Sequence, residues 1–216
     1  MNHRLFSLVC GALSLLAPVL AHAQTATQRD AELGQALQQG YGVVFMDSNI
    51  VRITHDECSH VNFAFTRQDD KTRLWVNIRN VSWLGAMIGQ TFGGVRELPP
   101  GDYVLASIEC GGGDRFHLDG PHARFQVRAR EIANIGMLKV ILSNEQANNF
   151  MGNLRAAFNP SEKQETQARR SVEPLSPRAV AYFKQTAPGT FARATARPMT
   201  LFGSAHGLVR EKGRFE

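Results

Sequence analysis

From residue 41 onward, apolar and polar residues alternate over short runs, a spacing typical of strands with one buried face. Turn-forming residues separate the runs at intervals typical of an all-β domain. A polar connection over residues 68–72 predicts a hairpin between two of the strands. The predicted strands are Gly42–Asp47, Ile50–Thr54, Val61–Arg67, Arg73–Arg79, Asp102–Glu109, Ala123–Arg128, Ile132–Ile135 and Leu138–Leu142.

The alternation gives each of these strands one face to bury. Phe63 and Phe65 share a face, and Phe125 and Val127 share a face on another strand. The opposite, polar side of that second strand carries Arg124, Gln126 and Arg128. Two sheets packed face to face bury such strands economically. The sequence therefore predicts a mainly β chain folded as an antiparallel β-sandwich of prealbumin-like or Ig-like type, with a closed cylindrical sheet as the alternative.

Short helices are predicted on both sides of the strand region. Residues 26–39 fit a helix with Leu33 and Leu37 on one face, and Gly40 is placed to end it. Near the other end, Ser176-Pro177 is a helix start, and Ala179, Tyr182 and Phe183 form an apolar stripe. Pro188 ends this helix, and a shorter one is predicted over residues 189–196. Residues 145–158 fit a helix and a returning strand equally well.

The first residues of the chain have the features of a secretory signal peptide. His3 and Arg4 precede an uncharged run from Leu5 to Leu20, and Ala21-His22-Ala23 places small residues where a signal peptidase reads them. We therefore predict cleavage after Ala23 and a periplasmic or secreted protein. The alternative is a retained N-terminal anchor helix, which is disfavoured because the apolar run is short for a bilayer and contains helix breakers. No transmembrane segment is expected in the chain after cleavage.

These features predict the following organisation of the chain. The segments are a signal peptide (1–23), an N-terminal helix (24–40), a β-sandwich domain (41–158) and a basic, partly helical C-terminal extension with a flexible tail (159–216).

Charge is distributed unevenly along the predicted mature chain. Residues 24–154 carry a net charge of −2, whereas residues 155–216 carry +6. A basic tail in an exported protein favours an anionic envelope surface or an unknown envelope protein as partner, and nucleic acid is not expected there. The alternative is a solvated tail with no partner.

The cysteines predict a disulfide. Cys10 would leave with the signal peptide, so Cys58 and Cys110 remain as an even pair in an oxidising compartment. Each lies beside a predicted strand, and a bond between strands of one sandwich closes a loop of roughly 50 residues. Such a loop is worth about 4 kcal/mol in the chain-entropy model.

A metal site is the competing hypothesis for the same neighbourhoods. His55 and His60 flank Cys58, while His117 and His122 follow Cys110, so copper or zinc ligands gather around both cysteines. No Cys-x-x-Cys or His-Glu-x-x-His spacing is present. The sequence also contains no nucleophile elbow, no phosphate-binding loop and no carboxylate pair spaced for acid and base chemistry. We therefore expect neither catalytic residues nor a cofactor.

One apolar segment does not fit the alternating pattern. Residues 81–95 carry no charge and include Trp83, Met87, Ile88 and Phe92. The segment is too short to span a bilayer. We predict that it lies over one end of the core, and an exposed version would be a contact surface for a partner or lipid.

Two stretches carry a family resemblance. Leu98-Pro99-Pro100-Gly101-Asp102-Tyr103-Val104-Leu105 is followed by Phe125-Gln126-Val127-x-Ala129-x-Glu131-Ile132 and then Gly136-x-Leu138. This pattern resembles uncharacterised bacterial exported proteins and lipoproteins with small prealbumin-like or PEGA-like β-sandwich domains. Family members commonly have glycine where this chain has Arg130. The resemblance covers residues 60–143 and implies a non-catalytic envelope module with a binding or structural role. The alternative is a periplasmic metal-binding protein or enzyme that uses the cysteine and histidine neighbourhoods.

Overall fold

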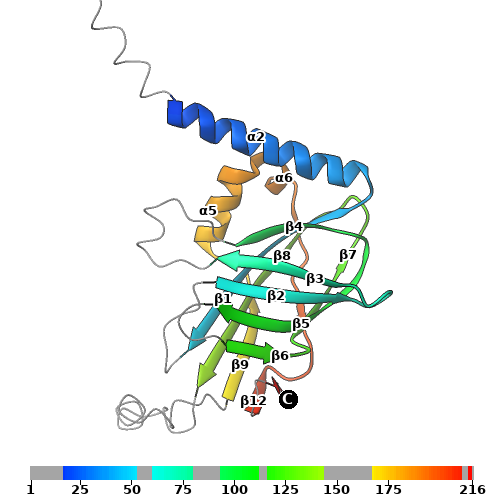
Figure 1. Ribbon diagram of the computed structural model, residues 1–216, viewed down its shortest axis with the longest axis vertical. Coiled ribbons are helices and arrows are strands. Elements are labelled where there is room, and N and C mark those ends of the chain that lie inside the picture. Colours follow the sequence, from blue (N-terminus) through cyan, green and yellow to red (C-terminus); the bar gives the residue numbers. More distant parts are fainter. Residues whose placement is uncertain are drawn as a thin grey trace, which may run out of the picture.

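A computed structural model describes residues 17–52, 60–79, 93–111, 116–143, 167–210 and 214–215, and it is mainly β (Figure 1). Its helices are α2 (Ala17–Gln38), α5 (Pro177–Thr186) and α6 (Pro188–Phe191). Its longer strands are β1 (Gly42–Arg52), β2 (His60–Arg67), β3 (Arg73–Arg79), β4 (Gly94–Leu98), β5 (Gly101–Gly111), β6 (Phe116–Asp119), β7 (Ala123–Val127), β8 (Ile132–Ser143) and β9 (Gln167–Glu173). The shorter strands are β10 (Thr195–Ala196), β11 (Thr200–Leu201), β12 (His206–Arg210) and β13 (Arg214–Phe215).

The strands form two sheets. Sheet A has the order β12-β9-β8-β1-β4, and β10 lies beside the start of β8. In sheet B, β5 is central, with β2 and then β3 on one side and with β6 and β7 on the other. The pairing of β12 with β13, and of β13 with β6, joins the two sheets.

Most strand pairs are antiparallel, but β1 runs parallel to β8. The purely antiparallel arrangement predicted from the sequence is therefore wrong at this pair. Nearly all strands of sheet B lie between β1 and β8 in the chain, and a long connection of this kind allows two strands to pair in parallel. The prediction of a mainly β chain with two sheets is confirmed.

The main core lies between the two sheets. Sheet B contributes an aromatic cluster in which the ring centroid of Phe125 lies 5.2 Å from that of Phe65 and 5.4 Å from that of Tyr103. Sheet A contributes Val44 and Met46 from β1, together with residues of β8. These side chains alternate with residues on the other face of each strand, as the period of two requires.

Sheet A also buries its second face, against the helices. Val43 and Phe45 of β1 pack with Leu33 of α2 and with residues of α5 and α6. The Phe45 ring centroid lies 4.9 Å from that of Phe183 and 5.0 Å from that of Phe191. The unbroken apolar run at the start of β1 follows from this double burial.

Two buried or partly buried carboxylates fix the helices to the rest of the chain. Asp30 of α2 accepts hydrogen bonds from the amides of Gly189 (2.9 Å) and Thr190 (2.8 Å) at the start of α6. These bonds hold the pKa of Asp30 below its usual value, although burial acts in the opposite direction and is the largest single influence. Asp47 of β1 accepts from the amide of Ser176, the residue that caps α5. Distant segments are thereby connected at the helix starts.

Several predicted elements are confirmed and others are joined. The strands β2, β3, β5 and β7, the hairpin at 68–72 and the helix that starts at Pro177 agree with the sequence. The predicted pairs Gly42–Asp47 with Ile50–Thr54, and Ile132–Ile135 with Leu138–Leu142, are wrong as separate strands, because each pair forms one continuous strand. In β8, Ile135 and Gly136 (φ of 82°) together lie opposite Met46 of β1, and this bulge accommodates the residues that look like a turn. In β1, Ser48 and Asn49 pair in register with Leu138 and Lys139.

The C-terminal region differs most from its prediction. The prediction that residues 159–216 form an extension outside the sandwich is wrong over 167–173, because β9 pairs with β8 along seven residue pairs. Ala168 and Arg170 of this strand are buried. The segment has little strand character in its sequence, because two arginines, a glutamine and a glutamate make it look solvated. Residues 167–202 therefore belong to the same folded unit as residues 42–143, and no boundary at 158 separates them.

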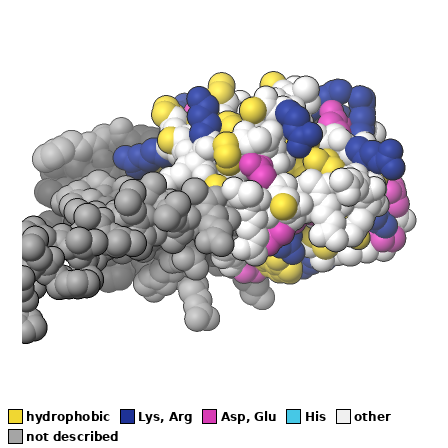
Figure 2. Space-filling model, turned by 90° about the horizontal axis from the view of Figure 1, so that it is seen from above, with side chains coloured by type: hydrophobic (Ala, Val, Ile, Leu, Met, Phe, Trp, Pro, Cys, Tyr) yellow, Lys and Arg dark blue, Asp and Glu magenta, His cyan; other side chains and the backbone are white. Residues whose placement is uncertain are grey.

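Basic side chains do not gather on one side of the molecule in the view from above. Figure 2 shows Lys and Arg side chains interspersed with Asp and Glu on that face. None of the helices in the described ranges combines the length and the apolar character that a membrane crossing needs.

Candidate functional site

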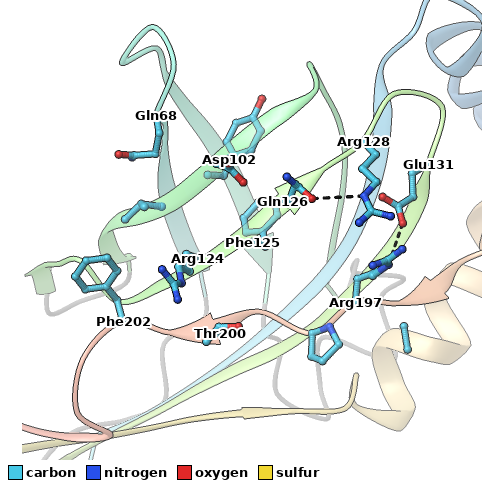
Figure 3. Close-up of a pocket in the computed structure, with 14 residues that line it drawn as sticks. Gln68, Asp102, Arg124, Phe125, Gln126, Arg128, Glu131, Arg197, Thr200 and Phe202 are labelled. Atoms are coloured by element: carbon cyan, nitrogen blue, oxygen red, sulfur yellow. Dashed lines mark hydrogen bonds and ion pairs between the residues drawn. The ribbon is translucent and has the colours of Figure 1, made fainter.

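A groove of about 730 Å³ opens on the outer side of β7, beside the segment that contains β10 and β11 (Figure 3). Two strands of sheet B form one wall, and the C-terminal segment forms the other. The lining residues are Gln68, Asp102, Tyr103, Val104, Arg124, Phe125, Gln126, Arg128, Glu131, Ala196, Arg197, Pro198, Thr200 and Phe202.

The groove exists because the C-terminal segment crosses from one sheet to the other. The amides of Arg197 and Met199 donate to the carbonyls of Asn134 (2.8 Å) and Ile135 (3.0 Å) in β8 of sheet A. Two residues later Leu201 pairs with Ala123 in β7 of sheet B. Only one end of β7 is covered by this crossing, and the outward side chains of the remainder face the groove.

A buried arginine anchors this crossing. The guanidinium of Arg170 donates to the carbonyls of Pro121 and His122 before β7, and to those of Phe202 and Ser204 in the C-terminal segment. Burial lowers the pKa of Arg170 from its usual value. Because four carbonyls from two segments converge on one cation, Arg170 holds the far wall of the groove against the sheet.

His122 is buried next to this anchor. Burial is the main cause that lowers its pKa to about 4, and the charge of Arg170 acts in the same direction. A ring nitrogen lies 3.0 Å from the carbonyl oxygen of Leu118. The side chain is therefore neutral at ordinary pH and is part of the joint between the sheets.

Positive charge on β7 is the main electrostatic feature of the groove. Arg124 lies on β7 and Arg128 directly follows it; both are exposed, and four residues of extended chain separate them by about 13 Å. Arg197 is paired with Glu131 at 3.0 Å, whereas Arg128 has only a long hydrogen bond of 3.4 Å to Gln126. Figure 3 shows these two contacts and no interaction at Arg124. Within the described ranges, no carboxylate pairs with Arg124 or Arg128.

The groove offers binding groups of a particular kind. Guanidinium and amide groups supply hydrogen-bond donors, and Phe202, 42% exposed, supplies an apolar surface at one end. No histidine, cysteine, serine or lysine is among the described side chains that line it. The hydroxyl of Tyr103 donates to the carbonyl of Pro99 at 2.7 Å, so it is engaged in the fold. This arrangement can hold an extended ligand that carries hydrogen-bond acceptors or negative charge.

The disulfide predicted from the sequence involves a residue that the structure does not describe. Cys58 lies outside the described residues, as does His55. The backbone of Cys110 lies in β5 opposite Val61 of β2, three residues along the chain from Cys58. The bond between Cys58 and Cys110 stays a prediction.

The other predicted site residues are separated or undescribed. His60 begins β2, His117 lies on β6, and His122 is buried before β7. The described ranges contain no group of three or more His, Cys, Asp or Glu side chains that could hold a metal ion. The apolar segment with Trp83, Met87, Ile88 and Phe92 lies outside the described residues, but Val95, at its end, belongs to β4.

The sequence pattern predicts the residues of one wall of the groove but not those of the other. The alternation in β7 placed Arg124, Gln126 and Arg128 on a polar face, and the structure confirms that they are exposed. The second wall comes from residues 196–202, which are about 70 residues away in the chain. The one local feature of this segment is Pro198, which indicates the end of a helix. The sequence pattern therefore does not connect residues 196–202 to β7.

Comparisons with known proteins assign no family to this chain. No protein-family model matches it, and no curated protein matches it. A leucine-rich repeat protein from Bacteroides thetaiotaomicron of known crystal structure is similar at 10% identity and a TM-score of 0.32, over 45% of this chain and 13% of that protein. A likeness at this level carries no information about the fold or the function of this chain.

Proposed function

We propose that the protein is a non-catalytic binding module of the cell envelope and that the groove beside β7 is its binding site for an anionic polymer. The observation that carries the proposal is the pair of arginines Arg124, on β7, and Arg128, directly after it, which face the groove without a carboxylate partner in the described ranges. Arginine is suited to carboxylate, sulfate and phosphate groups because its planar donors bind two oxygens at once.

The location and the finer fold class belong to the same proposal. The signal peptide would bring the chain to the periplasm or the outside, where anionic polymers and lipid head groups are present and where a Cys58–Cys110 disulfide would form. The prealbumin-like or PEGA-like sandwich suggested by the resemblance is compatible with two packed sheets. The proposed contact moves from the C-terminal tail as a whole to the groove, because Arg170 is buried and Arg197 is paired.

A binding experiment with a charged and an uncharged polymer tests the proposal. The chain from Gln24 onward should bind dextran sulfate at low salt and should not bind unsulfated dextran, because the attraction depends on charge. Arg124→Glu should weaken this binding about tenfold, since it removes one contact and adds repulsion. The matched control is Arg96→Glu, which changes the charge equally at an exposed position of β4.

Two results would overturn the proposal. One is equal binding of dextran sulfate by the Arg124→Glu and Arg96→Glu variants, since the attraction would then come from net charge alone. The other is no binding of dextran sulfate at low salt by the unmodified chain.

A further inference from the structure

A second surface, separate from the groove, lies on the outer face of sheet B. Its strands, β3, β2, β5 and β6, lie at the front of Figure 1, and no helix crosses them. The inner residues of these strands form the core, so the alternate residues face outward. We call this surface the sheet B platform; its accessible residues are Asn62, Arg73, Trp75, Asn77, Glu109, His117 and Asp119, whereas Ala64 and Ser107 on the same face are buried.

Strand register arranges these side chains in two rows across the four strands. One row runs from Trp75 through Ala64 and Ser107 to Asp119. The neighbouring row runs from Asn77 through Asn62 and Glu109 to His117. Four adjacent strands at a spacing of about 4.8 Å give each row a width of about 14 Å.

Hydrogen bonds between the platform side chains hold their polar groups in place. The amide of Asn77 donates to the side-chain oxygen of Asn62 at 2.7 Å, and the guanidinium of Arg73 donates to the hydroxyl of Ser107 at 2.7 Å. The ring of His117 lies between two carboxylates, with nitrogen to oxygen distances of 2.8 Å to Asp119 and 3.3 Å to Glu109. Groups fixed in this way lose little conformational entropy when a ligand binds.

The platform has one large apolar group, Trp75. It is 44% exposed, and the guanidinium carbon of Arg73 lies 4.8 Å from the centre of its ring. This cation–π contact restricts the indole while leaving much of it accessible. Indole rings combine an apolar face with an N–H donor, so they suit ligands that are themselves part apolar and part polar.

The chemistry of this surface favours a sugar chain over a protein partner. A sugar ring has an apolar face of C–H bonds and an edge of hydroxyl groups, which match an indole surrounded by fixed donors and acceptors. A stable protein interface needs about 800 Å² from each partner with a largely uncharged, apolar centre. A single tryptophan among charged and amide side chains does not supply that centre.

We propose that the sheet B platform binds a flat, β-1,4-linked glycan strand, with one sugar ring stacked on Trp75 and its neighbours hydrogen-bonded to the accessible polar side chains of Asn77, Glu109 and His117. A β-1,4-linked chain is extended and ribbon-like, and it therefore fits an open sheet face better than a coiled α-linked chain does. The proposal goes beyond the groove and does not depend on it.

The experiment measures binding of short glycans by calorimetry and by tryptophan fluorescence. The chain from Gln24 onward should bind the β-1,4-linked hexamer of N-acetylglucosamine more tightly than α-1,4-linked maltohexaose. Trp75→Ala should weaken binding of the β-linked hexamer at least about tenfold, whereas Trp75→Phe should retain most of it. Tyr41→Ala is the matched control, because Tyr41 is also an exposed aromatic residue, at 39%, but lies directly before β1 of sheet A.

The outcomes separate this site from the groove. Arg124→Glu should leave binding of the β-linked hexamer unchanged, and Trp75→Ala should leave dextran sulfate binding unchanged. The proposal is overturned if the unmodified chain binds neither hexamer, if Trp75→Ala and Trp75→Phe bind the β-linked hexamer as tightly as the unmodified chain, or if Trp75 mediates binding of a protein and of no glycan.

Discussion

The two sheets have similar inner faces but very different outer faces. Sheet A is covered on its second face by α2, α5 and α6, whose apolar side chains pack on Val43, Phe45 and Ile132. Sheet B carries polar side chains and Trp75 on the corresponding face, and no described helix covers it. A sheet that is buried on both faces has a structural role on both, whereas a sheet with one open face can present side chains to a ligand.

The amino-acid pattern of each sheet reflects this difference. β1 begins with consecutive apolar residues, because neighbours on both faces are buried. β7 alternates buried and exposed positions along its whole length. We therefore expect substitutions and truncations at the outer face of sheet A to cost stability, and substitutions at the outer face of sheet B to change binding.

The largest effect is expected from removal of α5 and α6, two of the three helices that cover sheet A, together with the C-terminal segment that pairs with β8 and β7. Truncation after Pro174 removes Ala179, Phe183 and Phe191, and exposes the apolar outer face of β1. The stabilising free energy lost with several buried side chains exceeds the free energy of unfolding of most domains, which is only a few kcal/mol. The truncated chain should therefore unfold or aggregate, as measured by circular dichroism and size-exclusion chromatography. A truncated chain that melts cooperatively at the temperature of the full chain would show that the helices do not stabilise sheet A.

A single substitution at each outer face gives a sharper comparison. Phe183→Ala should lower the free energy of unfolding by about 3–5 kcal/mol, because the ring is fully buried against Phe45. Trp75→Ala should lower it by only about 0.5 kcal/mol, because Trp75 is on the open face. Urea denaturation of both variants measures the difference. Equal losses would mean that the outer face of sheet B is covered as well.

The sequence predicts the strands of sheet B better than those of sheet A. In sheet B, apolar residues such as Phe63 and Phe65, or Phe125 and Val127, alternate with other residues because one face of each strand is open or polar. In sheet A, the turn predicted inside β8 is a bulge at Gly136, the break predicted inside β1 pairs regularly with β8, and β9 consists mostly of polar and charged residues. These strands are specified by long-range packing, which local periodicity does not record.

The candidate sites, like the strands of sheet A, depend on residues that are far apart in the chain. The exposure of Arg124 and Arg128 follows from the period of two in β7. The groove needs residues 196–202, and the platform needs the register of β3, β2, β5 and β6, and neither can be derived from local spacing. The period of two places Trp75 on the face opposite Leu74, Val76 and Ile78, but a lone aromatic residue in a strand does not by itself indicate a ligand.

A histidine buried between the sheets and a histidine on the open face of sheet B should affect the pH dependence of stability differently. The pKa of His122 is lowered to about 4 in the folded chain, mainly by burial, from an unperturbed value near 6.5. The unfolded chain therefore binds a proton more readily than the folded chain as the pH falls from about 6.5 to about 4. Stability is fully present above this window and is lost within it, by about 3 kcal/mol in total.

Urea denaturation across this pH range measures the loss. His122→Gln should remove most of this pH dependence, whatever its own effect on stability at neutral pH. His117→Gln, on the open face, should retain it. A pH profile that is the same with and without His122 would show that the histidine titrates alike in the folded and unfolded chains.

The smallest effect is expected at the turn that connects β7 of sheet B to β8 of sheet A. Arg130 has a φ of 61°, and its amide donates to the carbonyl of Tyr41 at 3.0 Å. A residue with a Cβ is disfavoured in this left-handed conformation by roughly 1 kcal/mol, whereas glycine adopts it freely. Arg130→Gly should therefore raise the free energy of unfolding by about 0.5–1 kcal/mol and the melting temperature by about 2–3 °C. Arg130→Ala keeps the Cβ and removes the rest of the exposed side chain, so it should give no gain. If both variants are stabilised equally, the gain comes from losing the charge and not from relieving the backbone.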